Sequence, residues 1–285
     1  MSGGKVERNT TIKYRLYPTP EQAAQIETTF TCCRMIWNAI LSDEEEFYAA
    51  TDEHFFPTPA KYKKSTPLFK EADSQALITV HQNLRRAFQD FFAGKNGYPR
   101  YKRKSSRNAY TDYCRHYERF PDSIYVNDVG IRLPKLGVVK ADMHRKPLHW
   151  WTLKSATVSR SQNGKYYCSV LFGYKVRPPE TVEPNAIGRV ETEELPEHIR
   201  KAEKKLAALE QRLRGMLFGS ENYEAQLRRI ARQREHIANQ KLDWAHKESH
   251  RLAEKYDAVE AGVADARLRG KLRYKLELRG KTLIE

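Results

Sequence analysis

The order of hydrophobic and polar side chains predicts a strand near the start of the chain. Residues 10–17 (TTIKYRLY) alternate between the two kinds, which is typical of a strand with one buried face. Ile12, Tyr14 and Leu16 would lie on that face. A single strand is not stable alone, so we expect later segments to pair with it.

Two amphipathic helices are predicted after this strand. The sequence TPE at 19–21 suits the cap and first turn of a helix, and apolar side chains then recur every three or four positions to about Tyr48. A second helix is predicted to begin at a cap formed by Asp73 or Ser74 and to end near Ala93. Each helix has one apolar face that must pack against another element.

Residues 109–173 have the pattern of an all-β segment. Polar turns at Asn127–Gly130 and at Ser161–Gly164, the second with an Asn-Gly pair, separate runs that are typical of strands and predict two hairpins. We expect the strand at 10–17 to join this set. Residues 175–185 (KVRPPETVEPN) are rich in Pro and predict a linker.

The pattern after the linker is helical. Residues 191–255 carry an apolar stripe at helical spacing, and glycines at 215 and 219 interrupt it, which predicts an antiparallel helical pair. The tail at 264–279 predicts another basic helix, which ends at Gly280. A bare coiled-coil hairpin is the alternative for the pair.

Charge adds a prediction about the partner. The 285 residues include 51 Lys and Arg against 36 Asp and Glu, so the formal net charge is 51 − 36 = +15, and 40% of the residues are hydrophobic. That composition supports a folded core and a polyanionic partner such as nucleic acid. No apolar run reaches 18 residues and the first residues show no secretory signal, so we expect a cytoplasmic protein without membrane contact.

The cysteines do not predict a metal site. Cys32, Cys33, Cys114 and Cys168 form no C-x-x-C pair, and short spacing is what lets two thiolates grip one zinc ion. We expect all four to be reduced. His246 and His250 are four residues apart, but without the Glu of an H-E-x-x-H motif we expect two surface histidines.

Several motifs resemble, in order and over nearly the whole chain, those of the TnpB (OrfB) family of transposon-encoded, RNA-guided nucleases related to type V CRISPR effectors. The motifs are YRLYPTPEQAAQI at 14–26, CRMIWNAIL at 33–41, LRRAFQDFF at 84–92, GYPRYKRK at 97–104, PKLG at 134–137, TVSRSQNGKYY at 157–167, KAEKKL at 201–206, IANQ at 237–240 and YKLELRGKTLIE at 274–285.

The resemblance implies an α+β architecture. A wedge-type β-barrel would comprise residues 1–19 and 105–180, with a helical recognition insert at 20–104. A truncated, mostly helical RuvC-like (RNase-H-like) domain without a zinc ribbon would follow at 186–285. The implied partners are a guide RNA made from a transposon-end-like scaffold and double-stranded target DNA that carries a short adjacent motif.

The carboxylates that hold two metals in RuvC nucleases are absent at the matched positions. Val190 stands where the family has its first Asp, and Gly262 stands where it has a Glu. The chain stops at Glu285, before the third carboxylate, and Glu260 is two residues from the second position. We therefore expect no catalytic metal, no cofactor and no enzymatic activity.

The resemblance then points to the TnpB-like nuclease-dead repressors, the TldR subset. Such a protein would recognise the adjacent motif, form a guide RNA–target DNA hybrid and repress transcription by blocking RNA polymerase. Three alternatives stay open: a DNA-binding regulator or inert transposon remnant that uses no RNA, a nuclease that uses other ligands, and a piece of a longer protein.

Candidate site residues fall into two groups. The adjacent motif would be read by polar side chains from the start of the second helix and from the loop that enters the β-segment: Ser74, Gln75, Thr79, Asn83, Tyr110 and Thr111. Basic side chains would hold nucleic-acid phosphates, with Tyr98 and Tyr101 interleaved as stacking platforms: Arg85, Arg86, Arg100, Lys102, Arg103, Lys104, Arg107, Lys201, Lys204, Lys205, Arg212, Arg228, Arg229 and Arg232. Trp37 and Phe88 are predicted core residues.

Overall fold

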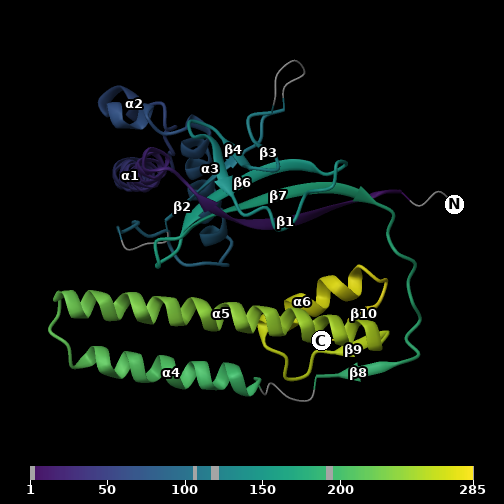
Figure 1. Cartoon of the computed structure of the whole chain (residues 1–285). Coiled ribbons are helices and arrows are strands. Elements are labelled where there is room, and N and C mark those ends of the chain that lie inside the picture. Colours follow the sequence, from purple (N-terminus) through teal and green to yellow (C-terminus); the bar gives the residue numbers. More distant parts are fainter. Residues whose placement is uncertain (1–3, 105–107, 117–121, 191–194, 285) are drawn as a thin grey trace. The chain divides into compact units, whose positions relative to one another are not determined.

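The computed structural model describes residues 4–104, 108–116, 122–190 and 195–284 (Figure 1). The chain divides into two compact units. We call Glu7–Tyr174 the N-terminal unit, and Lys175–Glu285 together with Met1–Val6 the C-terminal unit. Within the described ranges no helix has the length and apolar character needed to cross a membrane.

A seven-stranded sheet forms the centre of the N-terminal unit, in the order β2-β6-β7-β1-β5-β4-β3. The predicted alternation is confirmed in β1, where Ile12, Tyr14 and Leu16 are buried. Both predicted hairpins form, because β3 pairs with β4 and β6 with β7 in antiparallel register. The strands are β1 (Val6–Tyr17), β2 (Ala109–Tyr113), β3 (Tyr125–Val126), β4 (Gly130–Leu133), β5 (Gly137–Ala141), β6 (Thr152–Arg160) and β7 (Tyr166–Val176).

The predicted barrel is wrong, because this sheet is open. Closure requires the first and last strands of the sheet to pair. Here β2 and β3 stand at opposite ends of the strand order, and β3 spans only two residues. Strand β2 instead packs against two helices, α1 (Pro20–Thr51) and α3 (Ser74–Phe92).

Both long helices of the N-terminal unit begin where the sequence predicts. Thr19 caps α1 in a capping box with Gln22, and Asp73 caps α3 by accepting from the backbone N–H groups of Gln75 and Ala76. Their apolar faces join the core of the sheet, including Trp37 and Phe88 as predicted. Between them lie two short helices, α2 (Tyr62–Ser65) and η1 (Pro67–Lys70).

The C-terminal unit combines the predicted helical pair with a small parallel sheet. Helix α4 (Glu197–Arg214) packs against α5 (Glu221–Lys255), and α5 packs against α6 (Ala266–Glu277). The sheet has the order β10-β9-β8, with parallel pairing throughout. Its strands are β8 (Ile187–Arg189), β9 (Ala258–Glu260) and β10 (Thr282–Ile284).

Candidate nucleic-acid interface

A cleft of about 180 Å³ lies where α1, α3 and β2 meet in the N-terminal unit. It brings Thr79 and Asn83 of α3 together with Tyr110 and Thr111 of β2, so residues from both predicted motif-reading segments share one cleft. The full lining is Phe30, Cys33, Arg34, Ala76, Thr79, Val80, Asn83, Lys102, Arg103, Asn108, Ala109, Tyr110 and Thr111. Arg34 is an addition that the sequence analysis missed, because it lies on a helix whose predicted role was packing.

The six residues that were predicted to read the adjacent motif differ in their exposure. Asn83 is exposed, and Thr111 is half-buried with its hydroxyl 2.8 Å from that of Thr157. Ser74 accepts a hydrogen bond from Lys63 at 2.7 Å, and neither Ser74 nor Gln75 lines the cleft. Asn83 is therefore the side chain whose amide is best placed to meet a base edge.

Thr79, one of the residues predicted to read the motif, is buried. Thr79 is 3% exposed, and its hydroxyl donates to the carbonyl of Gln75, four residues earlier, at 2.9 Å. Tyr110 is 5% exposed and packs edge-on against Phe30, with ring centroids 5.7 Å apart. Burial raises the pKa of the Tyr110 hydroxyl well above its ordinary value. Both residues shape the floor of the cleft.

Helix α1 holds the basic segment 98–104 in place. The Asn38 amide donates to the carbonyl of Lys102 at 3.0 Å and accepts from the Lys102 backbone N–H at 2.8 Å. The indole N–H of Trp37 donates to the carbonyl of Arg100 at 3.0 Å. These three bonds fix the path of a segment that has no regular secondary structure.

Lys102 differs from its basic neighbours. Its ammonium lies 3.8 Å from the centroid of the Trp37 ring, a cation–π contact. Burial lowers the pKa of this lysine. Lys102 and Arg103 both line the cleft. Lys102 is half-buried, whereas Arg103 and the other predicted cations of this unit are exposed: Arg85, Arg86, Arg100 and Lys104. Arg107 lies outside the described residues.

Asn38→Ala is predicted to loosen the basic segment. The change removes two hydrogen bonds to the Lys102 backbone, and we expect a loss of about 1–3 kcal/mol of unfolding free energy. Hydrogen exchange at the Lys102 amide should accelerate, since that N–H loses its acceptor. Asn96→Ala, an exposed residue before the segment, is the control. Unchanged Lys102 exchange in Asn38→Ala would contradict the anchoring role.

The two tyrosines of the basic segment are tied to acidic residues of α1. Tyr98 donates to Glu44 at 3.3 Å, and Tyr101 donates to Glu45 at 2.5 Å. The Tyr98 ring also packs edge-on against Phe88 and Phe91. Both side chains are still about half exposed, which leaves part of each ring accessible for stacking.

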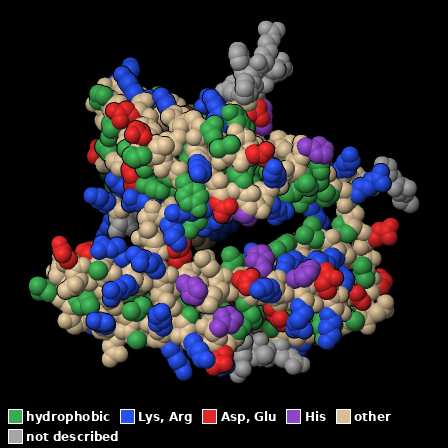
Figure 2. Space-filling view, in the orientation of Figure 1, with side chains coloured by type: hydrophobic (Ala, Val, Ile, Leu, Met, Phe, Trp, Pro, Cys, Tyr) green, Lys and Arg blue, Asp and Glu red, His purple; other side chains and the backbone are tan. Residues whose placement is uncertain are grey.

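The predicted cations of the C-terminal unit lie on the exposed surfaces of α4 and α5, and Figure 2 shows Lys and Arg side chains along these helices. Lys201 forms an ion pair with Glu197 at 2.8 Å, one turn earlier. The others are Lys204, Lys205, Arg212, Arg228, Arg229 and Arg232. These exposed side chains can contact phosphates, because a cation at the surface stays charged without the cost of desolvation.

The structure brings Val190 and Gly262 together. Because β8 and β9 are parallel with Arg189 opposite Glu260, Val190 lies beside the end of β9 and its N–H donates to the Glu260 carbonyl at 3.1 Å. Val190 is buried among apolar side chains of the C-terminal unit. Gly262 has φ +50°, and a Cβ added there would overlap the Val190 carbonyl oxygen. Glu260 pairs with Arg189 at 3.5 Å.

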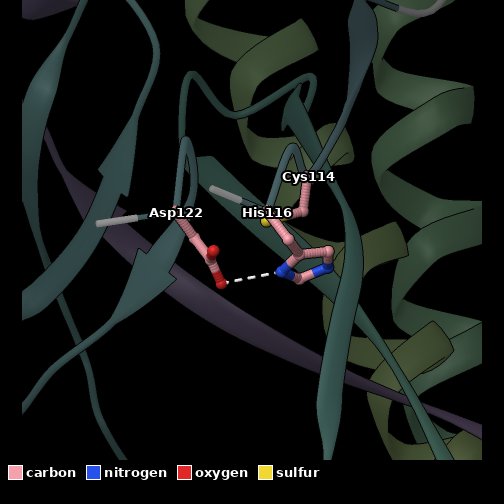
Figure 3. Close-up of side chains that lie close together, drawn as sticks. All are labelled: Cys114, His116 and Asp122. Carbon is pink, nitrogen blue, oxygen red and sulfur yellow. Dashed lines mark hydrogen bonds and ion pairs between the residues drawn. The ribbon is translucent and has the colours of Figure 1, made fainter. Parts of the chain in front are cut away.

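Three metal-ligating side chains meet in the N-terminal unit, at the two ends of the connection between β2 and β3 (Figure 3). His116 pairs with Asp122 at 2.8 Å, and the Cys114 thiol donates to the Ile124 carbonyl. Their ligand atoms lie within 4.8 Å of one another. Tetrahedral zinc needs such atoms roughly 3–4 Å apart. As it stands, the group is an ion pair beside a thiol.

Asp112, which follows the cleft residue Thr111, is a buried acid that the sequence did not predict. Asp112 is 0% exposed, and neither of its carboxylate oxygens accepts a hydrogen bond from the described residues. Burial, together with the negative charge of Asp73, raises its pKa to about 8. The strand alternation contained the signal, because Tyr110 and Asp112 are two residues apart and so share one face of β2.

Comparison with known proteins gives matches in sequence and in fold. The helix-turn-helix domain family HTH_OrfB_IS605 matches residues 8–53, which in this structure form one strand and one long helix. A protein of Streptomyces pristinaespiralis named as an RNA-guided DNA endonuclease is 27% identical over 267 residues, covering 87% of this chain and 65% of its own length. InsQ of Escherichia coli K12, named likewise, is 26% identical, covering 85% and 63%.

The fold is shared with a protein of very different sequence. A cryo-EM structure of a Cas12f1–sgRNA–target DNA complex aligns with a TM-score of 0.57 at 10% identity, covering 99% of this chain and 89% of that one. This match concerns the fold alone.

One prediction is contradicted by these relatives. The two curated proteins are named as DNA endonucleases, which are enzymes, and these names contradict the prediction of no enzymatic activity. The chain spans less than two thirds of the length of either relative. The chain is thus similar to the HTH_OrfB_IS605 family over residues 8–53, and over most of its length to two proteins named as RNA-guided DNA endonucleases.

Proposed function

We propose that this chain is an RNA-guided DNA-binding protein that reads a short duplex motif with the cleft between α1, α3 and β2. The observation that carries the proposal is that Asn83, Thr111, Arg34 and Arg103 line one cleft although they come from four separate segments. An amide that faces outward can bond a base edge, and arginines beside it can hold the phosphates that flank it. The relatives' names supply the guide RNA as the second partner.

Guide pairing would supply the rest of the sequence specificity. Exchange of a DNA duplex for an RNA–DNA hybrid is nearly balanced in free energy, so protein contacts to the backbones decide whether the hybrid forms. The exposed cations of α4 and α5 are suited to such contacts. A guide transcribed from a transposon-end-like scaffold would direct the complex to its site. Stable occupancy of a promoter would repress transcription by obstructing RNA polymerase.

The test is whether specific binding depends on RNA. The protein is purified with its bound nucleic acid, the RNA is sequenced, and binding to duplex DNA that matches the variable end is measured before and after ribonuclease treatment. We expect one discrete RNA and loss of site-specific binding after treatment. Unchanged site-specific binding would show instead a DNA regulator that works without RNA.

A matched pair of α3 variants separates motif reading from phosphate contact. Asn83→Ala should cost about 1–3 kcal/mol of binding free energy on the cognate motif and relax its specificity. Arg86→Ala should weaken binding to every sequence alike and lower the slope of log K against log salt by about one. Both side chains are exposed on the same helix. Equal losses on all sequences in Asn83→Ala would remove Asn83 from motif reading.

Guided DNA cleavage is a second candidate function, and the names of the relatives favour it. The guided complex is incubated with target DNA and Mg²⁺ or Mn²⁺, and the products are separated on a denaturing gel. A specific product that Glu260→Gln abolishes would assign the activity to the end of β9. Glu248→Gln, on the neighbouring α5, is the control for general loss of charge.

A further inference from the structure

The turn of the helical hairpin, between α4 and α5, carries strongly exposed hydrophobic side chains. Leu217 is 80% exposed and Phe218 is 83% exposed, and Figure 2 shows hydrophobic side chains at this end of the hairpin. The Phe218 ring is tilted against the Tyr223 ring, with the two centroids 5.2 Å apart. Adjacent exposed apolar side chains of this size commonly mark a contact surface.

An open groove of about 580 Å³ lies beside this turn. A groove of that volume is large enough for a ligand of nucleotide size. Its lining is Arg212, Met216, Leu217, Ser220, Asn222, Ala225, Gln226 and Arg229.

Gln226 is the unusual member of the lining. Its side chain is 1% exposed, and its Nε2 donates to the carbonyl of Leu209 at 2.8 Å. Its Oε1 is buried and has no hydrogen-bond partner within the described residues. Buried acceptors are normally satisfied, so this oxygen still lacks a donor, which a water molecule or a ligand in the groove would supply.

The positive charge around the groove favours an anionic ligand. Arg212 and Arg229 line it from the two helices, and Arg228 is exposed on the adjoining position of α5. Within the described part of the chain, neither Arg212 nor Arg229 has an acidic partner. Glu221 and Glu224 are also exposed on the first turn of α5, but they do not line the groove.

We propose that this groove binds one unpaired nucleotide of a single-stranded nucleic acid, and the proposal rests on the function proposed above. The flanking phosphates lie between Arg212 and Arg229, and a base amino group or sugar hydroxyl donates to Gln226 Oε1. The base stacks on Phe218, which is not itself a lining residue but directly follows the lining residue Leu217 in the turn. Base stacking on an aromatic side chain tolerates any sequence, so the site would hold a strand without reading it. Protein docking and self-association are the competing uses of the same surface.

The experiment measures binding of two 12-nucleotide single strands of the same sequence, one RNA and one DNA, each with a central 2-aminopurine, to the full chain freed of copurified RNA. Anisotropy gives affinity, and 2-aminopurine emission reports stacking. Phe218→Leu keeps an apolar side chain but removes the ring, and Leu242→Ala changes an exposed leucine elsewhere on α5. Circular dichroism checks that each variant is folded.

We expect Phe218→Leu to weaken binding about 5- to 100-fold and to remove the emission change, whereas Leu242→Ala does neither. A difference between the RNA and DNA arms would tell which strand occupies the groove. Equal affinity and emission in wild type and Phe218→Leu would overturn the site while leaving guided binding intact. A dimer that Phe218→Leu dissociates without changing oligonucleotide binding would also overturn it. Wild-type protein that binds neither strand would count against both proposals.

Discussion

Asp112→Asn should make the protein more stable at pH 8.5 than the wild type, by a few kcal/mol. In the folded protein the Asp112 carboxyl has a pKa of about 8, whereas in the unfolded chain it titrates near 4. The folded state therefore binds more protons across this window, and the free energy of unfolding falls as the pH rises from about 4 to about 8. Asparagine has a similar shape and no charge, so the variant should lose this dependence.

The measurement is urea unfolding of both proteins at pH 5, 7 and 8.5. The two should differ little at pH 5, and the gap should widen with pH at up to about 1.4 kcal/mol per unit. Asp128→Asn is the control, since that side chain is 80% exposed beside Lys146. A gap that stays constant with pH would mean that Asp112 is already ionised in the folded protein.

Gly262→Ala should cost about 2–4 kcal/mol of unfolding free energy. The residue has φ +50°, where a side chain is strained, and an added Cβ would overlap the carbonyl oxygen of Val190. The neighbouring backbone cannot move aside without a loss of stability, because the Val263 N–H donates to the Val190 carbonyl at 3.4 Å and Val190 is buried. The same geometry leaves no room for a carboxylate side chain at this position in the present backbone.

Gly270→Ala provides the matched control in the same unit. Gly270 lies inside α6, and an added Cβ meets no atom of the described residues within 4 Å. Alanine is the better helix former, so this change should stabilise the protein by roughly 1 kcal/mol. Thermal or urea unfolding should therefore move in opposite directions for the two variants. A loss of stability in both variants would contradict a local conflict at Gly262. It would show instead that the C-terminal unit tolerates no added methyl group.

Elements with strong local signals were predictable from the sequence. The cap at Thr19, the buried face of β1 and the Asn-Gly hairpin between β6 and β7 depend on residues close together in the chain, and all three are confirmed. The helical pair α4–α5 is confirmed for the same reason. Strands β9 and β10 were missed because three residues are too few to show a period.

Features that depend on distant contacts were not predictable from the pattern. Thr79 was a candidate for motif reading because it carries a hydroxyl, but packing of α3 against the sheet buries it, and the hydroxyl donates to the Gln75 carbonyl. The sheet ends at β2 instead of closing into a barrel, and β2 packs against α1 and α3, which are distant from it in the sequence. The segments that meet in the cleft could be predicted from the sequence, whereas the roles of Arg34 and the buried Asp112 depend on the fold.

The central position of β1 has a consequence for synthesis on the ribosome. β1 lies between β7 and β5 in the sheet, yet Tyr166, where β7 begins, follows the end of β1 by about 150 residues. At typical elongation rates that interval lasts on the order of 10–30 s. During this interval, the edge of β1 that will pair with β7 has no partner and can pair with a strand of another chain. The N-terminal unit must therefore complete its folding late, whereas α4 and α5 can pair soon after they emerge.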